Sequence, residues 1–279
     1  MQNRRSFLST LGVAALGCAT HAPGVGAFAS GRPRLERIGL QLYTVRGELR
    51  ADFAGTLAEV ARIGYREVEF AGYEGRPPAE VRALLAANRL TSPSTHVAYG
   101  QVTGNLDRVL ADARAVGHRW VTVPSLPAEE RATLAGWRGI AAAFNRAGAE
   151  ARAAGLRLAY HNHDVEFAPL DGTVPFDLLL AETDPDLVDF QLDLYWVARA
   201  GHDPMTYLTR HAERFVMVHV KDTTGPPEHR MVDVGAGTLD FPALLAQPAI
   251  QHHFVEHDRP ADAMASIRAS YAYLSGMNG

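Results

Sequence analysis

The stretch LRLAYHNHDVEF, residues 156–167, decides how the rest of the chain is interpreted. It begins as an apolar strand that closes at Tyr160, and it ends in titratable side chains, among them His161, His163 and Glu166. A short, nearly continuous apolar run is typical of a strand in a parallel sheet that is buried on both faces. Burying polar groups without partners costs free energy, so we expect these side chains to form a binding site at the end of the strand.

Short β-rich runs of this kind alternate with alanine-rich helical stretches over residues 35–279. The eight predicted strands are Ile38–Tyr43, Glu67–Phe70, Pro93–Val97, Trp120–Val123, Arg157–His161, Val188–Asp193, Phe215–Val220 and Phe254–Glu256. The predicted helices are Phe53–Ile63, Ala79–Ala87, Leu106–Val116, Trp137–Ala154, Pro175–Ala181, Pro204–His211, Phe241–Ala246 and Ala261–Ser275. Helix caps are predicted at Gly64, Gly117 and Gly155 on the carboxyl side and at Asp203 and Asp240 on the amino side.

Strands that alternate with helices pair in parallel, and eight such units predict an α/β fold, a single (β/α)8 TIM barrel over residues 35–279. A doubly wound open sheet is the alternative. It would show a glycine-rich first turn, and QLYTVRGELR, residues 41–50, is not one.

Composition and charge narrow the class of ligand. The chain has 279 residues, a formal net charge of -4 and a pI of about 6.3. A nucleic-acid-binding protein usually has a basic surface, so we expect no nucleic-acid partner. Small polar or neutral ligands fit this composition better, and a homo-oligomer stays open.

The first 29 residues resemble a signal peptide of the twin-arginine type. Arg4 and Arg5 precede an apolar run, and Ala27 and Ala29 are the small residues expected before a cleavage site. The run is short for a membrane anchor. Lipid attachment at Cys18, the only cysteine, is a minor alternative because ALGC is an imperfect lipobox. We therefore expect an exported, periplasmic protein.

Polar side chains stand where the predicted strands end, which is where a TIM barrel carries its active site. In chain order they are Glu69, His96, His161, His163, Asp193, His219, Lys221 and Glu256, with Arg259 behind the last. Two imidazoles and two carboxylates, His161, Asp193, His219 and Glu256, would converge in one mouth and suit one divalent cation, whether Mn, Zn, Mg or Co.

Each of these residues also has a structural interpretation. A single histidine at a strand end is more often a hydrogen-bonded core residue than a ligand, and Asp193 is placed to cap the following turn. Glu256 could pair with Arg259, and Lys221 could be a solvated charge. The metal hypothesis depends on four such residues ending four consecutive strands.

The segment VDVGAGTLDF, residues 232–241, has Gly235 and Gly237 before a predicted helix. It lacks the pattern of a phosphate-binding loop, so a tight loop that leads into the helix is the favoured interpretation. Glycine also lets a backbone approach a ligand closely, and that alternative stays open.

The segments YHNHDVEF, FQLDLYWV, AGHDP, MVHVKD, VGAGTLDF and FVEHD, in this order, resemble the xylose-isomerase-like TIM-barrel superfamily of sugar phosphate isomerases and epimerases. The resemblance implies one divalent metal held by a Glu, Asp, His, Glu set. These ligands fall on His161, Asp193, His219 and Glu256, so a histidine stands where the first glutamate is usual. Of the two glutamates that commonly move a proton across a cis-enediolate in the family, only Glu256 remains.

The predicted function is that of a metal-dependent isomerase or epimerase acting on a keto sugar or polyol through a metal-stabilised enediolate. Glu256, His163 and Lys221 are the expected catalytic residues, and His96, Glu69, Glu166 and Arg259 are expected to bind the substrate. One alternative is an exported 3-keto-glycoside lyase or dehydratase that uses the same enediolate. Another is a barrel that binds a sugar or a metal without catalysis.

Overall fold

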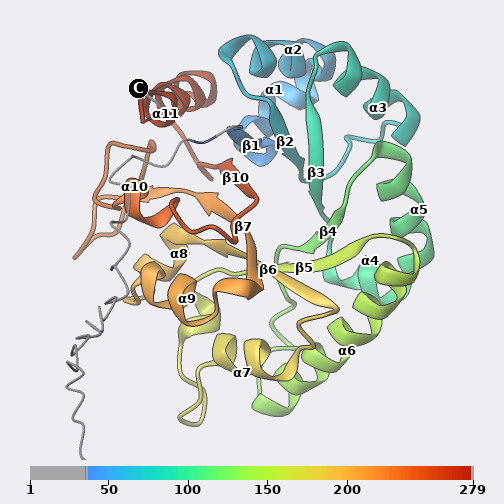
Figure 1. Cartoon of the computed structure of the whole chain (residues 1–279), viewed down its shortest axis with the longest axis vertical. Helices are drawn as coiled ribbons and strands as arrows, with labels where there is room; N and C mark the ends of the chain where they lie inside the picture. Colours follow the sequence, from blue (N-terminus) through green and yellow to red (C-terminus); the bar gives the residue numbers. More distant parts are fainter. Residues whose placement is uncertain (1–34, 36, 278–279) are drawn as a thin grey trace, which may run out of the picture. The chain divides into compact units, whose positions relative to one another are not determined.

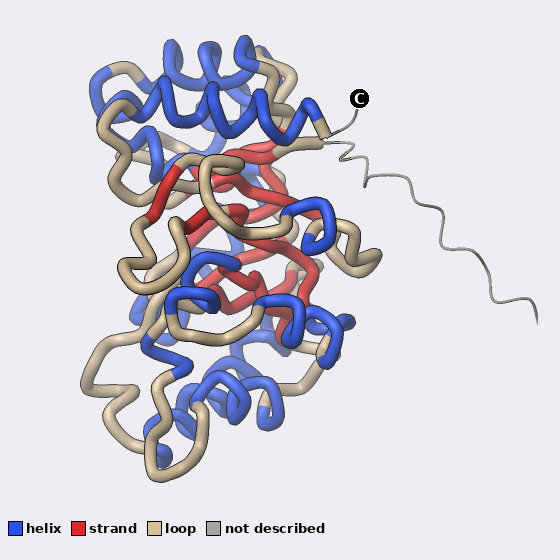
Figure 2. The backbone as a smooth tube through the Cα atoms, turned by 90° about the vertical axis from the view of Figure 1, so that its left-hand side faces the viewer, coloured by secondary structure: helices blue, strands red, loops and turns tan. Residues whose placement is uncertain are grey.

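The computed structural model describes residues 35 and 37–277, which fold around a closed barrel of eight parallel strands. The strands follow each other around the barrel in the order β1-β10-β7-β6-β5-β4-β3-β2, and β1 closes the barrel by pairing with both β2 and β10. Figure 1 shows the strands at the centre with α2, α3, α5, α6 and α7 around them, and Figure 2 shows the same arrangement from the side. The predicted (β/α)8 barrel is confirmed.

The barrel strands are β1 (Gly39–Gln41), β2 (Glu67–Phe70), β3 (Thr91–His96), β4 (Trp120–Val123), β5 (Arg157–His161), β6 (Val188–Asp193), β7 (Phe215–Val220) and β10 (His252–Val255). A separate hairpin pairs β8 (Asp222–Thr223) with β9 (Met231–Val232). The helices are α1 (Arg46–Ala51), α2 (Phe53–Ile63), α3 (Pro78–Ala87), α4 (Tyr99–Gly104), α5 (Leu106–Val116), α6 (Leu134–Ala153), α7 (Pro175–Glu182), α8 (Leu194–Arg199), α9 (Pro204–Arg210), α10 (Phe241–Leu244) and α11 (Ala263–Gly276). Three short 3-10 helices are η1 (Leu42–Val45), η2 (Val165–Phe167) and η3 (Ala212–Arg214).

The first strand is shorter than predicted because a side chain ends it. The prediction extended this strand to Tyr43, but the structure ends β1 at Gln41. The side-chain oxygen of Gln41 accepts a hydrogen bond from the backbone N–H of Tyr43 at 3.1 Å and starts η1. The last strand is also shifted: β10 covers His252–Val255, so Glu256 follows the strand instead of lying in it.

The third strand contains a proline at a position where the register shifts. β3 begins at Thr91, two residues before the predicted start at Pro93. Between β2 and β3, Thr91 pairs with Glu67 and Ser94 pairs with Glu69, so β3 carries one extra residue in this interval. A bulge of this kind tolerates a residue that has no N–H to donate.

Helix caps follow the sequence well. Asp203 and Asp240 cap α9 and α10 through bonds from Met205 N and Ala243 N, as predicted. At the start of α6, Thr133 accepts from the backbone and begins the helix at Leu134, three residues before the predicted start. The short helices α1, α4 and α8 were not predicted.

An apolar cluster fills the barrel towards the amino ends of its strands. Trp120, Ala159, Val216, Met217 and Phe254 form it, and each is buried. The polar side chains at the carboxyl ends of the strands therefore meet above an apolar layer.

The predicted signal peptide, with Arg4, Arg5 and Cys18, lies outside the described residues and stays a prediction. Within residues 35 and 37–277, no helix is long and apolar enough to cross a membrane.

Candidate active site

Strand register brings the site residues of β6, β7 and β10 together. Asp193 is the register partner of His219, and His219 in turn pairs with Phe254, two residues before Glu256. The backbone N–H of Glu256 donates to Val220 O at 3.3 Å, which extends the β7–β10 contact by one residue. Because parallel strands end at the same edge, these three side chains reach one point.

The four predicted ligands form a buried cluster. Oε2 of Glu256 lies 2.7 Å from Nδ1 of His219, and Oδ2 of Asp193 lies 3.9 Å from the same nitrogen. Nε2 of His161 lies 3.8 Å from Asp193 Oδ2. Despite these short separations, the three atoms Asp193 Oδ2, His219 Nδ1 and Glu256 Oε2 have no partner with hydrogen-bond geometry.

This donor set fits a divalent cation. The ligand atoms of Asp193, His219 and Glu256 all lie within 4.8 Å of one another, and His96, His161 and His219 form a second group of the same kind. Buried polar atoms without partners are costly, whereas carboxylate oxygen and imidazole nitrogen are ordinary ligands of zinc and related ions. These three atoms, which form ion pairs but no hydrogen bond of regular geometry, are therefore where an ion would be held.

Lys221 lies directly beside this cluster. Its Nζ is 2.9 Å from Asp193 Oδ2, 2.8 Å from Glu256 Oε2 and 2.8 Å from Asp258 Oδ1. The side chain is only 1% exposed. Burial alone would lower the pKa of Lys221, but these three carboxylates outweigh it and hold the pKa well above its usual range. Lys221 is therefore a fixed positive charge and not the solvated strand-end charge of the alternative interpretation.

A second hydrogen-bond network supports His219 from the opposite side. Oε2 of Glu69 lies 2.6 Å from His219 Nε2, accepts from Gln41 Nε2 at 2.7 Å and lies 3.2 Å from His96 Nε2. Its other oxygen accepts from Gln191 Nε2 at 2.8 Å, and Gln191 Oε1 lies 2.8 Å from His96 Nε2. When the His219 imidazole is neutral, as a metal ligand must be, an acceptor on Nε2 favours the tautomer whose Nδ1 lone pair points towards Asp193 and Glu256.

Glu166 holds the backbone at His163 and does not contact its imidazole. Its carboxylate accepts from the Tyr160 hydroxyl at 2.5 Å and from the backbone N–H of His163 at 2.8 Å. Neither Glu166 nor Glu69 lines the cavity described below, and both are buried. Their predicted contacts with a substrate stay predictions; the contacts observed are with neighbouring protein groups.

The protonation states of the cluster follow from burial and from its mixed charges. Burial raises the pKa of Asp193 to about 6 against the opposing effect of Lys221. Burial would also raise the pKa of Glu256, but Lys221 and His219 hold it well below its usual range. Although burial opposes it, the carboxylates of Glu256 and Glu69 raise the pKa of His219 to about 9. The pKa of His163 is lowered to about 4 by burial and by Lys221, so its imidazole is neutral at neutral pH.

The cluster opens into a cavity of about 870 Å³ at the carboxyl end of the barrel. Of the predicted site residues, those that line it are His96, His161, His163, Lys221, Glu256 and Arg259. Asp193 and His219 lie beneath it. The predicted pairing of Glu256 with Arg259 is not observed among the described residues, where Glu256 pairs with His219 and Lys221. Asp193 does cap α8, with Oδ1 accepting from Trp196 N at 3.0 Å, while its other oxygen remains in the cluster.

A family model described as a xylose isomerase-like TIM barrel matches residues 57–247. The chain belongs to this family. The xylose isomerase-like barrel is similar to a sugar phosphate isomerase/epimerase from Parabacteroides distasonis, with 25% identity and a TM-score of 0.73 over 91% of this chain and 98% of the other. The structure of an IOLI protein with a bound zinc atom shares the fold, at 14% identity and a TM-score of 0.69 over 87% of this chain and 98% of the other.

A curated relative matches a shorter part of the xylose isomerase-like chain. An inosose dehydratase from Lacticaseibacillus casei is 33% identical over 86 residues, which is 31% of this chain and 28% of the relative. The match spans less than a third of the length of the relative.

The glycine-rich loop of this xylose isomerase-like barrel is organised by an internal carboxylate. Asp222 accepts backbone hydrogen bonds from Gly235 at 3.0 Å, Gly237 at 2.9 Å, Thr223 at 2.8 Å and Leu239 at 3.3 Å. A Cβ on Gly237 would lie 2.3 Å from Asp222 Oδ1. This supports the tight-loop interpretation, because the N–H groups that a phosphate would need already bind Asp222.

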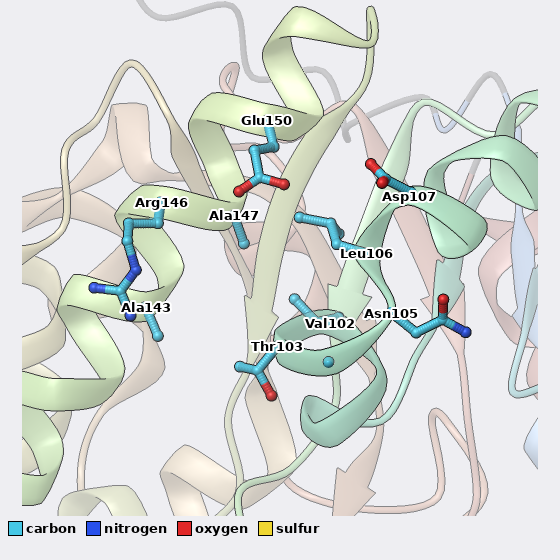
Figure 3. Close-up of a pocket in the computed structure, with 10 residues that line it drawn as sticks. Val102, Thr103, Asn105, Leu106, Asp107, Ala143, Arg146, Ala147 and Glu150 are labelled. Carbon is cyan, nitrogen blue, oxygen red and sulfur yellow. The ribbon is translucent and has the colours of Figure 1, made fainter.

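Figure 3 shows a second cavity, of about 320 Å³, between α4, α5 and α6. Arg146 and Glu150 of α6 face it from one side and Asp107 of α5 from the other. It contains none of the predicted site residues, and it lies on the helical layer outside the barrel.

Several supporting residues were not predicted. Gln41 and Gln191 donate to Glu69, Asp258 contacts Lys221, and Tyr43 and Trp196 line the cavity. Strand alternation could have found Gln191, since it lies two residues before Asp193 and shares its face. Gln41 ends β1 and Tyr43 ends the predicted first strand, so a search of the end of every strand would have included both residues.

Proposed function

We propose that this protein is a metal-dependent enzyme that moves a proton on the carbon next to the carbonyl group of a keto sugar or a related polyol. The observation that supports it most is the convergence of three orphaned ligand atoms, on Asp193, His219 and Glu256, beneath a cavity of sugar-binding size. Perturbed titratable groups in a cleft are typical of active sites.

Asp193, His219, Glu256 and His161 would hold the ion. Mn, Zn, Mg and Co are all candidates, and the zinc found in the related IOLI structure favours zinc for the first trial. A bound divalent ion supplies Lewis-acid polarisation of a carbonyl oxygen, which makes the neighbouring C–H more acidic.

The protein's own groups would move the proton. His163 is neutral and lines the cavity, so its free imidazole nitrogen can accept a proton from the substrate carbon. Glu256, also at the cavity wall, is the alternative base. The ammonium group of Lys221 would stabilise the negative charge that develops on the substrate oxygen. His96 and Arg259 would bind substrate hydroxyl groups from the cavity wall.

Two outcomes follow from the carbanionic intermediate. Return of the proton to the neighbouring carbon or to the opposite face gives isomerisation or epimerisation. Loss of a hydroxyl or alkoxyl group from the β-carbon breaks that C–O bond, forms a C=C bond and releases water or an alcohol after protonation. The inosose dehydratase relative favours the second outcome as the alternative function, because dehydration of a keto polyol is such an elimination.

Hydrogen exchange tests the common step. The purified protein, loaded with Zn²⁺ or Mn²⁺, should exchange substrate C–H for deuterium in heavy water with a panel of keto sugars and inososes. Product analysis by NMR separates epimers and isomers from enones. If the loaded protein catalyses neither exchange nor product formation with any of the panel, it is a binding protein and the proposal is wrong.

Metal content tests the site itself. His161→Ala and Asp193→Ala should lose bound metal, whereas His252→Ala should retain it. His252 is a matched control because it is a strand histidine bonded to Glu67 at the amino end of the barrel, 2.7 Å from its carboxylate. Equal metal content in all three variants would contradict the proposed ligand set.

We further propose that the protein is exported as a folded, metal-loaded enzyme. The support is the Arg4–Arg5 pair and the apolar run that follows it. A reporter that requires export, fused after residue 35, should become inactive when both arginines are replaced by lysine. Unchanged export of that variant would count against a twin-arginine route.

A further inference from the structure

The cavity above the site is divided into two chemically different halves. Every lysine, arginine, aspartate and glutamate that lines it comes from the part of the barrel that follows β6, β7 and β10. The half formed by residues after β1 to β4 is lined by Tyr43, Ala71, Ala98, Pro124 and Ser125, together with His96 at the end of β3. One side of the mouth is thus highly polar, and the other is mostly apolar and built from small residues.

Tyr43 gives the apolar half a flat, firmly held surface. Its side chain is 42% exposed, and Tyr43 is one of only two large hydrophobic residues exposed among the described residues. The guanidinium carbon of Arg46 lies 4.1 Å from the ring centroid, and the same side chain donates to Tyr43 O at 2.7 Å. Arg46 thus covers one face of the ring, and it does not line the main cavity. The opposite face remains for a ligand.

The neighbouring residues leave room in front of this ring. Ala71, Ala98 and Ser125 are exposed and small, and Pro124 is half-buried. The whole cavity measures about 870 Å³, near the upper end of the range of roughly 300–1,000 Å³ that accommodates drug-sized ligands. A single sugar ring is much smaller than such ligands, so it would occupy the polar half and leave the apolar half in contact with water.

We propose that the apolar half is a subsite for an apolar, preferably aromatic, group linked to the sugar. The substrate class is then a glycoside or similar sugar conjugate, with its sugar ring at Glu256, His163 and Lys221 and its aglycone against Tyr43, Ala71 and Ala98. The inference deepens the proposed function, because only that function fixes where the sugar ring lies. An aromatic aglycone stacks on an aromatic side chain with a gain beyond the burial of its area.

Charge argues against a phosphate group in this subsite. A phosphate placed against Tyr43 and the two alanines would have no cation among the lining residues of that half. Arg199, Arg230 and Arg259 belong to the other half, and Arg259 adjoins Thr44 and Arg46 at the boundary between the two halves. An anionic group would therefore be drawn to the half that already binds the sugar, and not to the apolar one.

Binding of unreactive glycosides tests the subsite without any turnover. Phenyl and methyl β-glycosides of glucose, galactose and xylose form three matched pairs, and calorimetry on the full-length protein gives the dissociation constant of each. For at least one pair, the phenyl glycoside should bind about 2- to 10-fold more tightly than the methyl glycoside, the ratio that one aromatic contact provides. Tyr43→Ala should abolish that preference and leave methyl glycoside binding unchanged, whereas Tyr43→Phe should retain it.

Several results would overturn the subsite. These are the absence of a phenyl preference in all three pairs, an equal loss of both ligands in Tyr43→Ala, and retention of the preference in that variant. The two proposals fail separately. If free keto sugars show C–H exchange but no phenyl preference is found, the proposed function stands and the subsite is wrong. If the phenyl preference is found without exchange, the subsite stands and the proposed function is wrong. Circular dichroism of Tyr43→Ala shows whether the variant is folded, and Ala98→Asp provides a second test by placing a charge in the apolar half.

Discussion

Replacing Glu69 by glutamine should weaken metal binding although Glu69 is not itself a ligand. The carboxylate accepts from Gln41 and Gln191 and lies 2.6 Å from His219 Nε2. In Glu69→Gln, one oxygen becomes an NH₂ group that faces a donor. Rotating the Gln41 amide to compensate would break its bond from Tyr43 N, so the network has no free rearrangement on that side. His219 then loses its charged acceptor.

The size of the effect follows from that single contact. Loss of a carboxylate that orients a metal-binding histidine typically costs about 10- to 100-fold in metal affinity, or roughly 1.4–2.8 kcal/mol. We expect the dissociation constant for Zn²⁺, measured by competition with a chelator of known affinity, to rise by this factor. The pKa of His219 should fall at the same time, because a nearby negative charge is removed.

Glu67→Gln is the matched control for this experiment. Glu67 lies two residues earlier on the same strand, is equally buried and bonds to His252 at the amino end of the barrel. The same chemical change there should leave the Zn²⁺ affinity within about twofold of that of the wild type, since no contact joins it to the cluster. Unchanged affinity in Glu69→Gln, or an equal loss in Glu67→Gln, would refute the idea that Glu69 positions His219.

Three further outcomes follow from particular contacts. Metal affinity should rise between pH 5 and pH 9 and level off above that, because Asp193 (pKa about 6) and His219 (pKa about 9) must lose their protons to act as ligands; a flat profile from chelator competition would contradict this. In Gly139→Ala of α6, the added Cβ has no atom within 4 Å, and the variant should be more stable by about 0.5–1 kcal/mol. In Gly148→Ala of the same helix, the added Cβ would lie 2.6 Å from a backbone oxygen, so this variant should be less stable than the wild type. Urea unfolding that ranks the two variants in the opposite order would contradict this account of the packing of α6. Burial lowers the pKa of His118 to about 4, so the stability contributed by its neutral form should be complete above pH 6.5 and lost as the pH falls towards 4. His118→Gln should therefore reduce the dependence of the free energy of unfolding on pH in this range. An unchanged dependence on pH in the variant would contradict the prediction.

The sequence was sufficient to predict the fold because the barrel is built from units that each have a local sequence pattern. Apolar runs of strand length, each followed by a helix with a capping residue, identify the units one at a time, and Val188–Asp193 was predicted to the residue. The short helix α8 was missed for a physical reason: the apolar residues Leu194 to Val197 continue the strand pattern without a break. The boundary is made by Asp193, whose side chain caps the helix while its other oxygen joins the cluster.

The sequence could predict the site only through the residues that lie at the ends of the strands. Parallel register turns adjacent positions on neighbouring strands into neighbours in space, so the approach of Asp193 to His219 followed from the strand assignment. The contact between Glu69 and His219 joins strands that are not paired with each other, since β2 and β7 meet only across the barrel interior. A pattern along the chain does not report which side chains cross the barrel, and the role of Glu69 is visible only from the coordinates.

The histidine at position 161 bears on the reaction more than any other departure from the family pattern. Burial and the positive groups His219 and Lys221 hold the pKa of His161 well below its usual range, so as a ligand it would add no charge where a glutamate would add a negative one. The cluster then keeps two carboxylates, Asp193 and Glu256, which match the charge of one divalent ion, while Asp258 remains for Lys221. A symmetric exchange of a proton between two glutamates is not available to such a site. One base on one face of the substrate suffices to remove a proton and expel a leaving group, and the apolar half of the cavity offers that group a place to bind. Under the proposed function, the missing glutamate is therefore compatible with the alternative elimination, while His163 and Glu256 keep the proposed isomerisation or epimerisation available.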